Sequence, residues 1–157
     1  MVWALLSVTL LWVATAMAAS PEARVDELLA GPEPRGIVFE VVEWDIDQLQ
    51  AVMPRIEALV ARVRARRPNL PVVVMSHGEE QFGFMQGHLN RRPQLRSIVE
   101  ALHRDDVVIQ VCGGYAVMSG YDSRRFTPLV TPVAEAVGAL AQYRRDGYAI
   151  VAVATAD

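Results

Sequence analysis

Strand-like and helix-like segments alternate along this chain from residue 36 onward. Four runs have the length and the β-branched or aromatic composition of strands. They are residues 37–44, 71–76, 107–111 and 148–153. Apolar residues recur at helical spacing in residues 49–63, 95–102 and 133–141. Strands that alternate with helices usually pair in parallel, so we predict an α/β sandwich with a mostly parallel sheet.

Three stretches set expectations for the helix limits. Pro54 interrupts the first helical pattern, so that helix either kinks there or begins near Met53. Thr131 and Pro132 predict the start of the last helix, with the threonine as its cap. A short helix is expected from Tyr115 to Ser119.

The N-terminal part of the chain has a different character from the rest. Residues 1–19 carry no charged side chain, and Ala16-Met17-Ala18 resembles a cleavage site after Ala18, so we predict a signal peptide and a periplasmic or otherwise exported protein. An uncleaved anchor is the alternative, because about 20 apolar residues can span a bilayer. Only then would the protein contact a membrane. Prolines and glycine in residues 20–35 predict a linker or loose N-terminal arm, which leaves 36–157 as the domain.

Composition excludes several functions. The net charge is −3, which argues against nucleic-acid binding. All 15 basic residues are arginine, so a Walker-type phosphate loop and lysine Schiff-base chemistry are excluded. The GxGxxG dinucleotide pattern is also absent, and we expect no cofactor. One cysteine, Cys112, excludes an intrachain disulfide, a CxxC pair and a multi-cysteine zinc site.

Two side chains that could take part in catalysis or binding directly follow predicted strands: His77 and Cys112. In parallel sheets, functional groups gather at this carboxyl-terminal edge of the strands. Cys112 is either a thiolate, activated by the short helix expected after it, or a buried inert thiol. His77 is either a base beside Cys112 or a loop cap, and we favour the loop cap. A metal site from His77, His88 and Glu79 or Glu80 lacks the usual ligand spacing, so we expect no metal. Trp44, Phe82 and Phe84 are expected in the core or an interface.

The region around Cys112 resembles the DsrE/DsrF-like family of small sulfur-relay proteins. The similarity rests on the strand VVIQV that closes in Cys112, on Ala116 and Gly120, on Thr-Pro-Val at 131–133, and on Gly-Tyr-Ala at 147–149. Together with the His-Gly ending of the second strand, it covers residues 36–153. It implies a three-layer, flavodoxin-like α/β fold with about five strands, assembled as a homo-oligomer, a trimer or hexamer.

The resemblance also implies a function. Cys112 would hold sulfane sulfur as a persulfide and pass it to a partner thiol, acting more as a carrier than as a sulfurtransferase enzyme with high turnover. Its partners would be sulfur donor and acceptor proteins or small sulfane-sulfur species. The amides of Gly113 and Gly114 would stabilise the anionic sulfur, as backbone N–H groups do in anion nests, with His77 nearby. The alternative is a non-catalytic ligand- or protein-binding module in which Cys112 only packs.

The loop that follows this segment carries Tyr121, Asp122, Arg124 and Arg125. Its arginines would suit an anionic sulfur species such as thiosulfate, but we favour a solvated charged loop.

Overall fold

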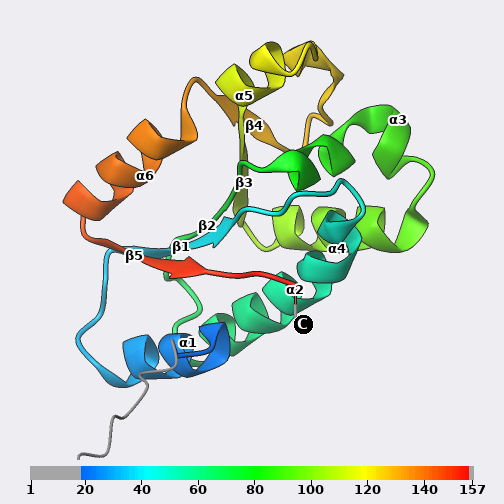
Figure 1. Cartoon of the computed structure of the whole chain (residues 1–157). Coiled ribbons are helices and arrows are strands. Elements are labelled where there is room, and N and C mark those ends of the chain that lie inside the picture. The colour runs from blue at the N-terminus through cyan, green and yellow to red at the C-terminus, as the bar shows by residue number, and fades with distance from the viewer. Residues whose placement is uncertain (1–18, 156–157) are drawn as a thin grey trace, which may run out of the picture.

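A five-stranded sheet forms the centre of the computed structural model, which describes residues 19–155 (Figure 1). Its strands are β1 (Gly36–Val41), β2 (Val72–Ser76), β3 (Val108–Cys112), β4 (Thr131–Val133) and β5 (Tyr148–Ala152). All four pairings are parallel, in the order β4-β3-β2-β1-β5. The predicted α/β fold with a parallel sheet of about five strands is confirmed.

Helices cover the two faces of the sheet unequally (Figure 1). Helices α1 (Pro21–Ala30), α2 (Gln48–Arg66) and α4 (Pro93–Arg104) contribute to the larger core, on one face. Helix α6 (Ala136–Arg145) packs on the other. Shorter elements follow the strands at their carboxyl ends: the 3₁₀ helices η1 (Glu79–Phe84) and η2 (Ser123–Arg125), and helices α3 (Gln86–Leu89) and α5 (Gly113–Met118).

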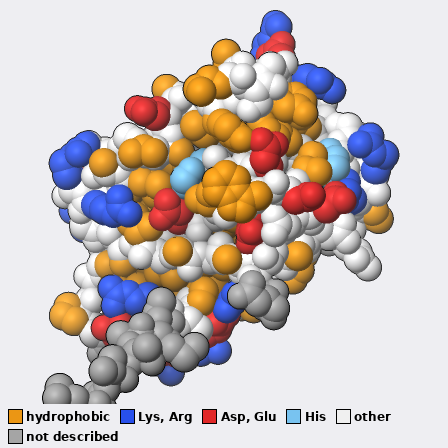
Figure 2. Space-filling model, viewed as in Figure 1, with side chains coloured by type: hydrophobic (Ala, Val, Ile, Leu, Met, Phe, Trp, Pro, Cys, Tyr) orange, Lys and Arg blue, Asp and Glu red, His pale blue; other side chains and the backbone are white. Residues whose placement is uncertain are grey.

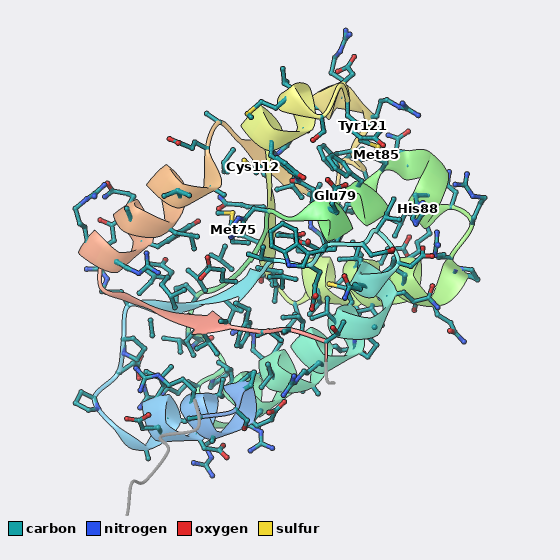
Figure 3. All side chains as sticks on the ribbon, in the orientation of Figure 1. Met75, Glu79, Met85, His88, Cys112 and Tyr121 are labelled. Carbon is teal, nitrogen blue, oxygen red and sulfur yellow. The ribbon has the colours of Figure 1, made fainter. Side chains whose placement is uncertain are left out.

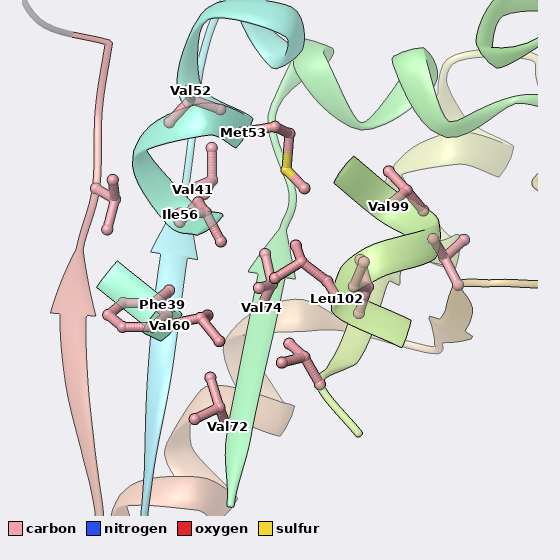
Figure 4. Packing of buried hydrophobic residues seen from close by; sticks show 14 of the residues in the cluster. Phe39, Val41, Val52, Met53, Ile56, Val60, Val72, Val74, Val99 and Leu102 are labelled. Carbon is pink, nitrogen blue, oxygen red and sulfur yellow. The ribbon is translucent and has the colours of Figure 1, made fainter. Parts of the chain in front are cut away.

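The larger core lies between the sheet and α2 and α4. Phe39 and Val74 point from the sheet toward Ile56 of α2 and Leu102 of α4 (Figure 4). Every residue of β2 is buried, as expected of a central parallel strand covered on both faces. Burying each such apolar side chain stabilises the fold by roughly 1.5–3 kcal/mol. The apolar residues whose helical spacing predicted α2 are therefore the ones that pack on the sheet.

The hydrophobic layer between the sheet and α6 is much smaller. Val73 and Met75 pack against Ala136 and Leu140 of this one helix. Val108, on the same face of β3, is 45% exposed. The sheet is therefore partly open on this side.

The prediction of a loose arm is wrong for residues 21–30, which form α1. Ser20 caps this helix by accepting a hydrogen bond from the Ala23 amide, and Pro21 occupies the first turn, where proline is tolerated. Val25 and Leu29 are buried in the larger core. The predicted signal peptide, apart from Ala19, lies outside the described residues. Within residues 19–155, no helix combines the length and apolarity needed to cross a membrane.

The predicted helix start at Thr131 is also wrong. Thr131 and Pro132 belong to β4, and α6 begins only at Ala136. β4 is an edge strand, where the missing N–H of a proline leaves no ladder bond broken inside the sheet. The alternative in which the first helix begins near Met53 is not observed. Helix α2 runs from Gln48 to Arg66, with the exposed Pro54 inside it.

Candidate functional site

Cys112 is the last residue of β3 and the cap of α5. Its side chain is on the face covered by α6, in a cluster that includes Met75, Ala136 and Leu140 (Figure 3). The residue is 9% exposed. Cys112 is therefore largely buried between the sheet and α6, on the face that this one helix covers.

Two hydrogen bonds hold the cysteine. Its amide donates to Oε1 of Gln81 at 2.8 Å, which continues the β2–β3 hydrogen bonding beyond the end of β2. The amide of Tyr115 donates to Sγ at 3.4 Å. The sulfur is therefore held in a polar contact in the first turn of α5.

Gly113 and Gly114 have a steric role. A Cβ on Gly114 would lie 2.6 Å from the carbonyl oxygen of Ala134, and one on Gly113 would lie 3.0 Å from that of Val133. The Gly114 amide donates to the same Ala134 oxygen at 3.1 Å. That amide is therefore engaged with the segment after β4, and the amide that donates to the Cys112 sulfur is that of Tyr115.

His77 follows β2 directly, and its amide extends the ladder by donating to the Val41 oxygen at 3.1 Å. Met75 lies opposite Gln110 in the register, so the residues two further along, His77 and Cys112, come to the same edge and face of the sheet. The imidazole Nε2 lies 3.0 Å from Oε1 of Glu40, on β1, the neighbour of β2 on the side away from β3. Glu40 is the acidic partner that sequence alone did not identify.

A buried carboxylate, Glu80, ties together the loops that follow β1 and β2. Its Oε2 accepts the Glu43 amide at 2.7 Å, and its Oε1 accepts the Ser76 hydroxyl at 2.8 Å and the Gly78 amide at 3.1 Å. Burial raises the pKa of Glu80, while these hydrogen bonds act in the opposite direction. Its role is to fix the loop that carries His77 and Gln81.

Tyr115 belongs both to the surroundings of Cys112 and to an aromatic group formed by Tyr115, Phe82 and Tyr121. Its hydroxyl donates to Oε1 of Glu79, which raises the pKa of Tyr115. Its ring stacks on Phe82 with centroids 5.8 Å apart, and Phe82 in turn lies 4.3 Å from the ring of Tyr121. Phe82 and Phe84 are buried as predicted. Trp44 is 80% exposed, which is consistent with an interface residue but not with a core residue.

The four side chains weighed as metal ligands have separate partners. Glu79 accepts from Tyr115, Glu80 from Ser76, His77 contacts Glu40, and His88 contacts Arg92. Within residues 19–155, no three His, Cys, Asp or Glu side chains are grouped closely enough to hold a metal ion. The chemistry this arrangement offers is that of a single, hydrogen-bonded thiol.

Comparison with solved structures supports the fold. The chain is similar to MTH1491 of Methanobacterium thermoautotrophicum, a protein of unknown function, with a TM-score of 0.59 and 18% identity over 74% of this chain and 96% of that one. It is also similar to the ychN protein of E. coli, with a TM-score of 0.58 and 15% identity over 75% and 98%. Both have the DsrE/DsrF-like fold, which this chain shares. No protein-family description and no curated protein matches the sequence.

Proposed function

We propose that this protein is a small sulfur carrier that holds sulfane sulfur as a persulfide on Cys112 and passes it to a partner thiol. One observation carries the proposal: the only cysteine of the sequence ends a strand of a DsrE/DsrF-like sheet, with its sulfur accepting the Tyr115 amide under a face of the sheet that a single helix covers. A carrier needs a polar contact at its sulfur and a route by which a donor can reach it. Cys112 has the contact with the Tyr115 amide, and the thin helical cover over its face of the sheet supports the route.

The transfer needs no oxidant and no second cysteine. The Cys112 thiolate attacks the sulfane sulfur of a donor R–S–SH, a new S–S bond forms at Sγ, and the donor sulfur leaves as the thiolate R–S⁻. An acceptor thiolate then attacks the outer sulfur of the persulfide, and Sγ leaves as a thiolate. The Tyr115 amide stabilises Sγ each time it carries the negative charge.

The decisive test is the intact mass of the purified protein after exposure to polysulfide. We expect wild type to gain the mass of one or more sulfur atoms, reversibly on reduction, and Cys112→Ser to gain none. Cys112→Ser is a close control because a hydroxyl also accepts the Tyr115 amide. Absence of any gain in the folded wild-type protein refutes the carrier function.

Packing of Cys112 against Met75 and Leu140 favours a second candidate, a binding module in which the thiol is structural. The alkylation rate of Cys112 separates the two. A carrier thiol reacts in the native protein near neutral pH, whereas a structural thiol reacts only after denaturation.

We also propose that the protein is a homo-oligomer, a trimer or hexamer, that covers apolar side chains left exposed here. Among them are Trp44, Val108 and Val137. Figure 2 shows hydrophobic side chains across the middle of the face in view, with the arginines mostly toward its margins. Light scattering should give a mass above that of one chain, and Trp44→Ser should lower it. A wild-type protein that stays monomeric at high concentration contradicts this assembly.

Export through residues 1–19 completes the proposal. Helix α1 begins at Pro21 with Ser20 as its cap, so cleavage after Ala18 would leave every described helix and strand intact. Protein recovered from the periplasm of an expressing bacterium should begin at Ala19. Recovery in the membrane fraction with residues 1–18 retained would support the anchor and contradict cleavage.

A further inference from the structure

A cavity of about 190 Å³ is lined by Phe82 and Tyr121 of the aromatic group but not by Cys112. Its apolar wall consists of Ile46, Phe82 and Met85, and its polar side chains are His88, Arg91, Tyr121 and Arg125. Figure 3 shows Met85 and His88, from the η1–α3 segment, near Tyr121, which follows α5. The cavity therefore joins the loop after β1, the η1–α3 segment and the loop after α5.

Backbone hydrogen bonds hold the walls in place. Met85 and Phe126 form an isolated antiparallel bridge, and the Thr127 amide donates to the Phe84 oxygen at 2.9 Å. The Tyr121 amide donates to the Ala116 oxygen at 2.8 Å. The cavity is thus formed by fixed segments, which lowers the entropy lost when a ligand binds.

The charges around the cavity follow a pattern. Two pairs of consecutive arginines flank it, and in each pair one arginine has a carboxylate: Arg92 pairs with Asp47, and Arg124 pairs with Asp122. Within residues 19–155, the other two, Arg91 and Arg125, make no salt bridge, and both line the cavity. Two guanidinium groups are therefore left to meet an anion.

His88 adds a polar group without a third charge, and its Nε2 faces Arg92. Its pKa is lowered by burial first and then by Arg92 and Arg91, so the imidazole is neutral at pH 7. With the hydroxyl of Tyr121, it places neutral polar groups beside the two guanidiniums.

We propose that this cavity binds a small organic anion, whose carboxylate or sulfonate meets Arg91 and Arg125 and whose apolar body contacts Phe82 and Met85. Guanidinium groups bind such oxyanions with strong, charge-assisted hydrogen bonds. The apolar wall disfavours a purely inorganic anion, which has nothing to bury there. The volume is below the roughly 300–1,000 Å³ of drug-sized sites, so the ligand is small.

This inference does not depend on sulfur transfer. Cys112 does not line the cavity, and Phe82 has its ring between those of Tyr115 and Tyr121. The structure also divides the loop that sequence analysis treated as one: Tyr121 and Arg125 face the cavity, while Asp122 and Arg124 pair with each other.

Benzoate, benzamide and inorganic sulfate are suitable probes, titrated into the purified full chain by calorimetry. We expect benzoate to bind, and benzamide and sulfate to bind at least about tenfold more weakly, since each lacks either the charge or the apolar body. Arg125→Gln should weaken benzoate binding roughly 10- to 100-fold, as expected for loss of a charge-assisted contact. Arg124→Gln is the matched control, because it removes the same charge one residue away, from a side chain that is 89% exposed, and should leave affinity unchanged.

Three results would each overturn the inference. One is equal weakening by Arg124→Gln and Arg125→Gln, which would indicate general surface charge. Another is benzamide or sulfate binding as tightly as benzoate. The third is the absence of benzoate binding at millimolar concentration in wild type. Urea unfolding of both variants verifies that they remain folded, and Cys112→Ser should bind benzoate as wild type does.

Discussion

Replacing Gly114 by alanine tests the contact that places Cys112 and α5 against the segment after β4. The new Cβ would lie 2.6 Å from the backbone oxygen of Ala134, closer than a Cβ can normally approach. The same oxygen accepts the Gly114 amide, so the two segments cannot separate without weakening that 3.1 Å hydrogen bond. Overpacking of this kind costs about 1–3 kcal/mol, and a weakened hydrogen bond about 0.5–1.5 kcal/mol.

Part of that cost is offset, because alanine restricts the unfolded chain more than glycine does, by about 0.4–1 kcal/mol. We therefore expect Gly114→Ala to lower the free energy of unfolding by about 1–3 kcal/mol, measured by urea denaturation. The shift should also move the Tyr115 amide relative to Sγ and change the alkylation rate of Cys112.

Gly138→Ala is the matched control. Gly138 is an exposed residue of α6, and a Cβ there meets only the end of the flexible Glu135 side chain, at 3.3 Å. Alanine at such a helical position should stabilise the protein by up to about 1 kcal/mol. If Gly114→Ala is as stable as wild type and its thiol reacts at an unchanged rate, the close approach of these segments is refuted.

Three further substitutions test the fold and its pH dependence. Ile56→Ala should lower the free energy of unfolding by about 2–5 kcal/mol, because it leaves a cavity in the larger core; a loss below about 1 kcal/mol in urea would contradict that packing. Arg55 lowers the pKa of Glu22 to about 2 from 4.5, so the pair stabilises the protein above pH 4.5 and loses this effect as pH falls toward 2. Because both side chains are partly exposed, Arg55→Gln should cost only about 1 kcal/mol at pH 7. Near pH 2 it should cost less, since only the hydrogen bond from Arg55 to the Ala154 oxygen is then lost, and an equal cost at both pH values would be inconsistent with the ion pair. Burial raises the pKa of Glu80, so the contribution of Glu80 to stability should fall as pH rises from 4.5 through its folded-state pKa. Relative to wild type at the same pH, Glu80→Gln should therefore be more destabilising at pH 4 than at pH 8 in thermal melts.

The strands and the main helices were predictable because their patterns are local. β2 reads as an unbroken apolar run, and α2 as a stripe at helical spacing, whatever the rest of the chain does. The position of Cys112 at the end of a strand followed from the same run, since VVIQV leads straight into it.

The errors occurred where local signals were ambiguous. Pro132 suits both the first turn of a helix and an edge strand, and only pairing with Val111 on β3 selects the strand. Residues 21–30 lie within a stretch of proline and glycine signals that predicted a linker, and Val25 and Leu29 are buried because α1 packs on α2.

Amino-acid order alone indicates most of the strands and the main helices and puts a single thiol at the carboxyl end of β3, because backbone geometry imposes periods that neighbouring residues must satisfy. Folding decides which polar groups meet that thiol and its surroundings. Gln81 bonds to Cys112, 31 residues away in sequence, and Glu40 contacts His77, 37 residues away. The cavity is lined by three segments that are separate in sequence. Such partners depend on strand order and register, which arise when the whole sheet assembles and leave no trace in a local pattern.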